Sequence, residues 1–266
     1  MKQQMPATKI ATHGGPKQMI VREISAKSVL SKSQVYDYAM NPYVGCSHSC
    51  RYCYAAFMRR FTGHREKWGA FVDVKINAPE LLAREIGKKR KRGRVWVSGV
   101  CDPYQAAEKK YGLTRRCLEV LLENQWPVTV QTKSSLVLRD IEILERFQDI
   151  EIGFSIATAD EKIRKLFEPG ASPIGERIGA LEVLHGRGIP TFAMIAPLLP
   201  GADGLVEELA GIVDRVLIDR LNYFYANRIY KENGLEWAME DAFFHWQAEV
   251  LEEGFKRTGT PVQVLF

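Results

Sequence analysis

The stretch IEIGFSIATADEKIRKLFEPGASPIGERIGALEVLHGRGIPTFAMIAPL, residues 150–198, shows the pattern that decides the fold. An apolar, β-branched run at 150–158 is followed by a helical segment at 172–188 and by a second apolar run at 190–198. Strand-length runs that alternate with helices of about 10 to 15 residues are typical of parallel βαβ units, not of a β-sandwich. The stretch therefore predicts a βαβ unit.

The same alternation extends through most of the chain. Further strand-length runs lie at 36–44, 71–76, 94–100, 127–132 and 215–218, and further helical segments at 78–89, 113–124, 138–147 and 204–216. Repeated around a closed or nearly closed sheet, such units form a barrel or partial barrel with its chemistry at the carboxyl ends of the strands. An open, doubly wound parallel sheet is the alternative.

The pattern divides the chain into three parts. Residues 1–35 are polar and lack sustained periodicity, so we expect an N-terminal arm. Residues 36–222 hold the alternating strands and helices and form the predicted core. Residues 223–266 indicate a helix followed by a short strand, which we expect to form a C-terminal extension packed on the core.

The composition is that of a soluble globular protein. Hydrophobic residues make up 46% and charged residues 26% of the 266, which argues against a mostly disordered chain. No stretch approaches the roughly 20 apolar residues of a membrane span, and the start of the chain has no apolar signal-peptide core. We expect a cytoplasmic protein without a membrane partner. The basic run at 88–94 predicts a solvated helix end or, alternatively, a patch that contacts nucleic-acid phosphates.

Three of the five cysteines, Cys46, Cys50 and Cys53, lie within eight positions. Together with the scattered Cys101 and Cys117 they do not form an even disulfide framework, so metal binding is the better interpretation. A zinc knuckle needs a fourth ligand, and His48 is the nearest candidate. A [4Fe-4S] cluster held by only three cysteines keeps one iron open for a substrate or cofactor.

The spacing Cys-x3-Cys-x2-Cys, with Tyr52 before the third cysteine, resembles the signature of the radical S-adenosylmethionine (SAM) superfamily. SGVCDPYQAAEKKYGLTR, VQTKSSLVLRD, FSIAT and LFEPGASPIGERIGALEVLHGRGIP extend the resemblance to an uncharacterised branch that is similar to spore photoproduct lyase. The resemblance covers roughly residues 20–222. It implies an α/β fold, a partial (βα)6-type TIM-like barrel with an N-terminal arm and a C-terminal helical extension.

The resemblance also implies an activity. Cys46, Cys50 and Cys53 would hold a [4Fe-4S] cluster whose fourth iron is chelated by SAM. Reductive cleavage of SAM would generate a 5'-deoxyadenosyl radical that abstracts hydrogen from an unidentified substrate, with flavodoxin or ferredoxin as the reductant. The alternatives are a DNA photoproduct lyase-like repair enzyme and a non-catalytic iron–sulfur electron carrier or zinc-binding adaptor.

Four residues are expected to contact SAM because they match the lyase or the superfamily by position. Lys133 would meet the SAM carboxylate, Ser98 the amino group, Ser155 the ribose and Tyr52 the adenine edge. Without the resemblance, a lysine at a strand end is more often a solvated cation. The serines would then be small residues that fill the end of a barrel.

A polar run follows the strand that ends near Ser98. Asp102, Tyr104, Gln105 and Glu108 could bind substrate or SAM there, and we take Asp102 and Gln105 as candidate SAM contacts. Alternatively the run is a helix-capping turn, with Asp102 as the N-cap before a proline.

The chain departs from the lyase at the residues that carry the reaction. Trp96 stands where the lyase has its hydrogen-donor cysteine, two positions before Ser98. Cys101 could supply a thiol from nearby, if it is exposed in the site, or be a small buried residue. Tyr54 is the one positional candidate for the lyase's radical-relay tyrosines. Cys101 and Tyr54 are therefore the candidate catalytic residues, and the reaction type is not inherited.

Two charged pairs are predicted to be structural. Glu168 and Arg177 could form an ion pair that holds the loop after the strand at 150–158. Arg139 and Asp140 open a helix, where a carboxylate is favoured by the helix dipole.

Overall fold

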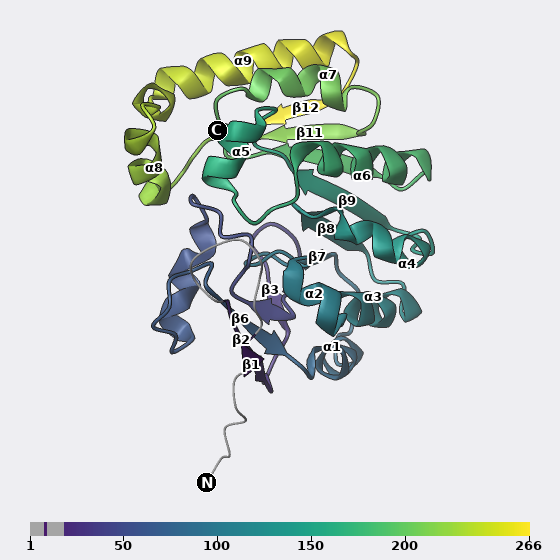
Figure 1. Cartoon of the computed structure of the whole chain (residues 1–266). Helices are drawn as coiled ribbons and strands as arrows, with labels where there is room; N and C mark the ends of the chain where they lie inside the picture. The colour runs from purple at the N-terminus through teal and green to yellow at the C-terminus, as the bar shows by residue number, and fades with distance from the viewer. Residues whose placement is uncertain (1–7, 10–18) are drawn as a thin grey trace. The chain divides into compact units, whose positions relative to one another are not determined.

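The structure, a computed structural model, describes residues 8–9 and 19–266 (Figure 1). The remainder of the predicted arm lies outside the described residues. The chain forms two compact units, which are described separately. Among the described residues, unit 1 comprises residues 8–9, 19–49, 55–130 and 146–149, and unit 2 comprises residues 50–54, 131–145 and 150–266.

One sheet of unit 1 has the strand order β1-β2-β6-β5. Its strands are β1 (Thr8–Lys9), β2 (Ile20–Ile24), β5 (Tyr43–Val44) and β6 (Phe71–Lys75). β6 is parallel to β2 and antiparallel to β5. The run at 71–76 is thus a strand, as predicted, but its neighbours come from the predicted arm and from the residues before the cysteines. Because β6 pairs with β2 and β5, it belongs to this separate sheet and is not one of the barrel strands.

Unit 1 also contains the first strands of the parallel series. β3 (Leu30–Lys32) is antiparallel to β4 (Tyr38–Met40). β4, β7 (Val95–Val97) and the first residues of β8 (Val128–Thr132) are parallel. The helices are α1 (Ala78–Gly87), α2 (Ala106–Tyr111) and α3 (Leu113–Glu123). α1 packs on α3, and both of these helices bury leucines, as the apolar spacing predicts.

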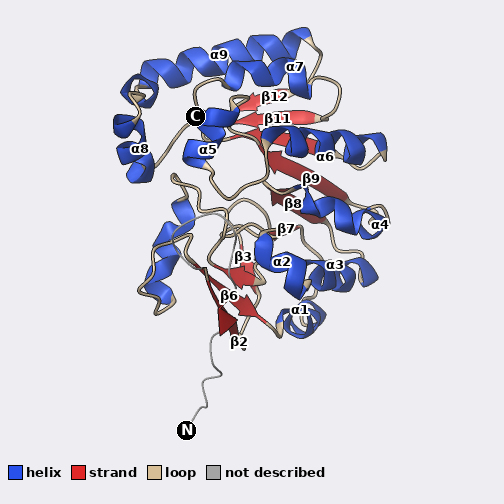
Figure 2. Cartoon of the chain, viewed as in Figure 1, coloured by secondary structure: helices blue, strands red, loops and turns tan. Residues whose placement is uncertain are grey.

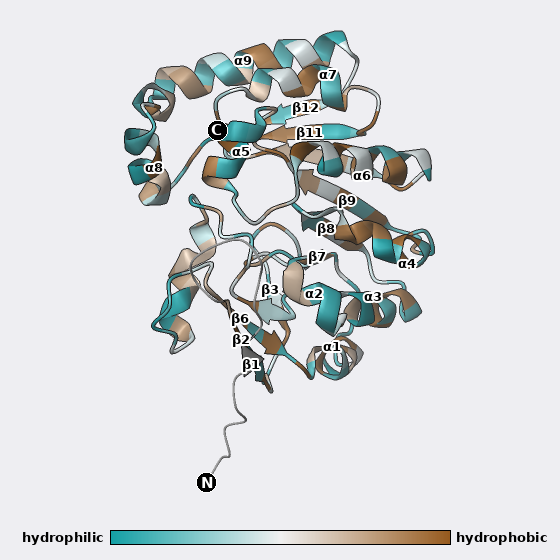
Figure 3. Cartoon of the chain, in the orientation of Figure 1, coloured by the Kyte–Doolittle hydropathy of each residue, from teal (hydrophilic) through white to brown (hydrophobic). Residues whose placement is uncertain are grey.

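Unit 2 contains four parallel strands in the order β9-β10-β11-β12. They are β9 (Ile150–Ser155), β10 (Thr191–Ile195), β11 (Arg215–Ile218) and β12 (Val262–Val264). β9 and β10 are joined through α6 (Ile174–Gly186), which confirms the predicted βαβ unit. Figure 3 shows brown, apolar stretches on β9 and β11, and the apolar residues of β9, β10 and β11 are largely buried. A Cβ on Gly153 would lie 2.0 Å from the Phe192 ring, so only glycine fits there.

The remaining helices of unit 2 are shown in blue in Figure 2. They are α4 (Ile141–Leu144), α5 (Glu161–Phe167), α7 (Leu205–Leu209), α8 (Asn227–Glu232) and α9 (Asp241–Arg257). The 3-10 helices of the chain are Tyr54–Phe61, Ser135–Asp140, Ala202–Gly204, Phe224–Ala226 and Glu236–Met239. The tail ends in α9 and the short strand β12, as predicted, but the helical segment before the strand is interrupted after α8, where Gly234 has a φ of 66°.

The helix predicted at 204–216 is shorter than the pattern suggested. α7 ends at Leu209, Ala210 is extended, and Gly211 has a φ of 79°, in the left-handed region. The apolar residues that follow, Val213 and Val216, are buried without continuing the helix. Among the described residues, no helix is both long enough and apolar enough to cross a bilayer.

Candidate functional site

The first cysteine follows directly from β5 in unit 1. Gly45 has a φ of 86°, and a Cβ on it would lie 2.3 Å from the carbonyl oxygen of Phe71, so a side chain is excluded. Cys46 is buried, and its carbonyl accepts a hydrogen bond from Ser49 N at 3.4 Å. The chain thus turns sharply on both sides of Cys46.

The second and third cysteines belong to unit 2. Cys53 N donates to Cys50 O at 3.3 Å, and Arg51 N donates to Phe167 O at 2.8 Å, at the end of α5. Burial raises the pKa of the Cys50 thiol to about 12, and the charge of Lys133 opposes this shift. Because iron binds the thiolate, loading the site with metal would release this proton.

Tyr52 and Lys133 meet beside these cysteines. The ring of Tyr52 is buried, and its hydroxyl donates to Glu168. The Lys133 ammonium lies 5.9 Å from the centre of the same ring, within the range of a cation–π contact. Lys133 follows the last residue of β8, so it projects from the carboxyl end of a strand, where the fold is expected to carry its chemistry.

Glu168 and Arg177 form the predicted ion pair. Arg177 Nη1 and Glu168 Oε2 are 2.6 Å apart, and neither side chain has more than 1% of its surface exposed. Arg177 also donates to Ser155 O at 2.9 Å and to Ser172 O at 2.8 Å. Burial alone would raise the pKa of Glu168, but the charges of Arg177 and Lys133 lower it instead. The pair ties the end of β9 to the loop before α6.

Ser155, the last residue of β9, completes this group. It is buried, and its hydroxyl accepts a hydrogen bond from Gln131 Nε2 at 2.9 Å. Of the six predicted SAM contacts, the structure therefore brings together Tyr52, Lys133 and Ser155 around the Glu168–Arg177 pair in unit 2. Arg139 and Asp140, predicted to open a helix, lie directly before α4, and Arg139 Nε is 2.8 Å from an oxygen of the buried Asp140.

Ser98, the predicted contact of the SAM amino group, lies in unit 1. It is buried with a φ of 69°, a left-handed conformation that is uncommon for a residue with a side chain. Its hydroxyl is 3.4 Å from the sulfur of Cys101, which also lies 3.5 Å from Tyr43 O. Cys101 is partly buried against an apolar cluster, and burial raises the pKa of its thiol to about 12. Its predicted role as a hydrogen donor stays a prediction.

Asp102 does not cap a helix. α2 begins four residues later, at Ala106, and Asp102 Oδ1 instead accepts from Tyr104 N at 2.9 Å within a turn. Its other oxygen is 3.3 Å from Nδ1 of the buried His48, without hydrogen-bond alignment. The N-cap alternative is wrong because Pro103 and Tyr104 turn the chain before the helix starts.

Gln105 and Glu108 are fully buried and bind backbone around them. The Gln105 amide accepts from Ser47 N at 2.8 Å and donates to Gly45 O at 3.1 Å. Glu108 accepts from the Tyr43 hydroxyl and, at 2.9 Å, from Thr114 N at the start of α3. The sequence indicated polar side chains here but not that they bind main-chain atoms of other segments.

Tyr54, the candidate relay residue, is part of a row of aromatic rings in unit 2. Its ring stacks on Tyr223 at 6.2 Å and an interplanar angle of 24°, and Tyr223 stacks on Tyr225 at 5.9 Å. All three tyrosines are exposed. This row was not predicted from the sequence, although the aromatic residues that follow β11 indicate where it lies.

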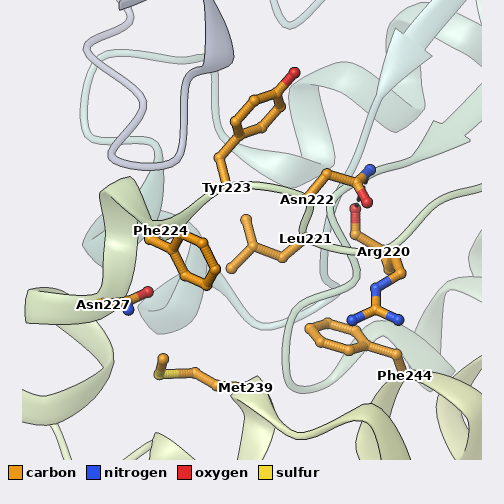
Figure 4. A pocket seen from close by; sticks show the side chains of 8 residues that line it. All are labelled: Arg220, Leu221, Asn222, Tyr223, Phe224, Asn227, Met239 and Phe244. Carbon is orange, nitrogen blue, oxygen red and sulfur yellow. Dashed lines mark hydrogen bonds between the residues drawn. The ribbon is translucent and has the colours of Figure 1, made fainter.

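A pocket of about 300 Å³ adjoins Tyr223 (Figure 4). It is lined by Arg220, Leu221, Asn222, Tyr223, Phe224, Asn227, Met239 and Phe244. The Arg220 guanidinium is paired with Asp241 and lies 5.1 Å from the centre of the Phe244 ring. The pocket thus has a mixed polar and apolar lining, and the charge of Arg220 is already paired with Asp241.

The basic run at 88–94 begins just after α1 and leads into the amino end of β7. Residues 88–92 are exposed. Lys89 lies over the Tyr38 ring, and Arg94 pairs with Asp149. The run is therefore a solvated helix end, which lies at the amino end of β7 in unit 1. Its contact with phosphate stays a prediction.

The donor set of the cysteine loop fits an iron–sulfur cluster. In the described part of the chain, no three His, Cys, Asp or Glu side chains gather around a point where they could hold a single ion. The cysteines of a four-iron cluster bind different irons, so three thiols spread along one loop match that group. Two cationic side chains, Lys133 and Arg177, lie near Cys50 and would offset the negative charge of a thiolate-bound cluster.

Comparisons with known proteins show the family of the chain. The sequence pattern of the Radical SAM superfamily matches residues 40–212. An uncharacterized protein from Methanocaldococcus jannaschii is 36% identical over 180 residues, which cover 67% of each chain. A radical SAM Nalpha-GlyT isomerase from Pseudomonas phage M6 is 26% identical over 204 residues, and the match spans 74% of this chain but 40% of the phage protein.

Solved structures give the fold. A spore photoproduct lyase complexed with a dinucleoside spore photoproduct superposes with a TM-score of 0.70 at 15% identity, covering 92% of this chain and 82% of the lyase. The predicted fold class, an α/β fold of the partial TIM-like barrel kind, is thereby confirmed.

Proposed function

Because the chain belongs to the radical SAM superfamily, we propose that it is an enzyme that holds a [4Fe-4S] cluster on Cys46, Cys50 and Cys53. When bound and reduced, this cluster supplies the electron that cleaves SAM to a 5'-deoxyadenosyl radical, which removes a hydrogen atom from the substrate. The protein must then bind SAM in one orientation and keep competing reactions out.

One observation carries the proposal: Lys133, Tyr52 and Ser155 converge beside Cys50 and Cys53 in unit 2. Lys133 offers a cation at a strand end, suited to the carboxylate of SAM, and its approach to the Tyr52 ring restricts where the ammonium can lie. Ser155 offers a hydroxyl, oriented by Gln131, for the ribose. The Glu168–Arg177 pair holds both Tyr52 and the end of β9 in place.

The other predicted site residues have supporting roles in the proposal. Ser98 is assigned to the SAM amino group. Asp102, on the polar loop after Ser98, is a second candidate SAM contact. Tyr54, which is exposed and next to Cys53, is the candidate radical-relay residue. Cys101 stays a candidate thiol donor, and a flavodoxin or ferredoxin is the proposed reductant.

SAM binding tests the site directly. The anaerobically reconstituted protein should bind SAM, and Lys133→Met should weaken binding by about 1.5 to 3 kcal/mol, roughly 10- to 150-fold, since a charge-assisted hydrogen bond is lost. Lys162→Met, which removes an exposed lysine from α5 of the same unit, is the control and should bind normally. Equal affinity in both variants would contradict the role of Lys133.

The second candidate function is a lyase-like enzyme acting on DNA. It is favoured by the exposed stack of Tyr54, Tyr223 and Tyr225, because aromatic rings of this kind stack on unpaired bases. Trp96 at the donor position argues against the same reaction as spore photoproduct lyase. Single-stranded DNA should then bind in a salt-dependent way, and less tightly to Tyr223→Leu. Absence of binding at low salt would count against this function.

A further inference from the structure

The amide of Gln105 brackets the first cysteine. Its oxygen accepts from Ser47 N at 2.8 Å, and its nitrogen donates to Gly45 O at 3.1 Å, so it binds the residues on either side of Cys46. Gln105 is fully buried, and its side chain does not cap α2. Both hydrogen bonds of this side chain thus go to the backbone around one cysteine.

Neighbouring contacts hold the same segment. Ala106 N donates to the Ser47 hydroxyl at 3.2 Å. Gly45 lies against the carbonyl of Phe71 and cannot shift toward it. Tyr43, two residues earlier, is tied to Glu108 on α2. The backbone at Cys46 is therefore fixed by protein contacts within unit 1, before any ligand binds.

We propose that Gln105 is a positioning residue that fixes Cys46 for the iron–sulfur cluster, instead of a SAM contact. This inference rests on the proposed function. Groups that hold metal ligands from outside orient them and reduce the ordering needed when the metal binds. Without the bracket, Gly45 O and Ser47 N would lose their buried partner and the loop could rearrange.

Two variants and a matched control isolate the effect. Gln105→Met removes both hydrogen bonds with little change in length, whereas Gln105→Glu keeps the acceptor for Ser47 N but not the amide donor. Gln125→Met is the control, because Gln125 brackets Phe147 in the same way, accepting from Gln148 N at 3.0 Å and donating to Arg146 O at 3.3 Å.

The measurements are the rate of iron release to a chelator and the electron paramagnetic resonance spectrum of the reduced cluster. Gln105→Met should release iron about 10- to 100-fold faster than the unmodified protein and give an altered spectrum. The rate of iron release from Gln105→Glu should lie between those of Gln105→Met and the unmodified protein. The rate from Gln125→Met should equal that of the unmodified protein. If Gln105→Met does not fold, the comparison of iron release and spectrum between Gln105→Glu and Gln125→Met tests the inference.

Unchanged iron release and spectrum in the Gln105 variants would overturn the inference. Equally fast release from Gln125→Met would overturn it too, because the effect would then follow general destabilisation. If the unmodified protein itself held no cluster, the proposed function would fail first. The two failures are therefore distinguishable.

Discussion

Replacing Arg177 by methionine should cost this protein a large part of its stability. Arg177 is fully buried and lies 2.6 Å from the carboxylate of Glu168, which is also buried. It further satisfies the carbonyls of Ser155 and Ser172. Methionine fills similar space but leaves the carboxylate and both carbonyls without this partner.

The magnitude follows from what stays buried. Removing one partner of a buried ion pair typically costs about 3 to 5 kcal/mol, since an uncompensated charge is left behind. The Tyr52 hydroxyl and the charge of Lys133 still act on Glu168, which favours the lower end of that range. We therefore expect Arg177→Met to lower the free energy of unfolding by about 3 kcal/mol. Adding Glu168→Gln should restore part of this loss, because the buried charge is then gone.

Urea unfolding of the metal-free protein, followed by circular dichroism, measures the change. Arg187→Met is the control, because Arg187 pairs with Glu145 at 3.0 Å on the surface of the same unit and should cost at most about 1 kcal/mol. Equal losses for Arg177→Met and Arg187→Met would refute the reasoning. So would a double variant that is less stable than Arg177→Met alone.

Two further predictions concern local structure, and thermal or urea unfolding checks both. Gly153→Ala should destabilise the protein by about 1 to 3 kcal/mol, because its methyl group would clash with Phe192. Gly179→Ala on α6, where the added methyl group meets no atom, should stabilise the protein by about 0.5 to 1 kcal/mol. Similar effects of the two substitutions would contradict the packing argument. Asp160→Ala should cost about 1 kcal/mol, because Asp160 caps α5 by accepting from Lys162 N at 2.7 Å; an unchanged stability would show that the cap is unimportant.

The sequence predicted those parts of the fold whose signal is local. The runs that became β7 to β11 are apolar and β-branched over the right length, and α1, α3 and α6 have clear apolar spacing. The end of α7 was not predicted correctly because the apolar pattern continues past Leu209. That pattern favoured a helix through Gly211, which instead adopts a left-handed φ. β2 was missed because its pairing with β6 joins segments about fifty residues apart.

The candidate site was predictable where a motif or a resemblance named the residue. Tyr52, Lys133 and Ser155 were expected as SAM contacts and lie together in unit 2. The Glu168–Arg177 pair was expected as structural, but its contact with Tyr52 was not. The bracket around Cys46 was not foreseen, because a glutamine in a loop gives no sign of which backbone atoms it binds. The pocket beside Tyr223 depends on α8 and α9 as well as on the aromatic run.

Reductive cleavage of SAM tests the central claim most directly. Anaerobically reconstituted protein should hold about four irons and form 5'-deoxyadenosine from SAM when dithionite is added. The variant with Cys46, Cys50 and Cys53 all replaced by alanine should hold no cluster and form none. Iron-loaded protein that leaves SAM intact, or an alanine variant that cleaves it at the same rate, would contradict the account.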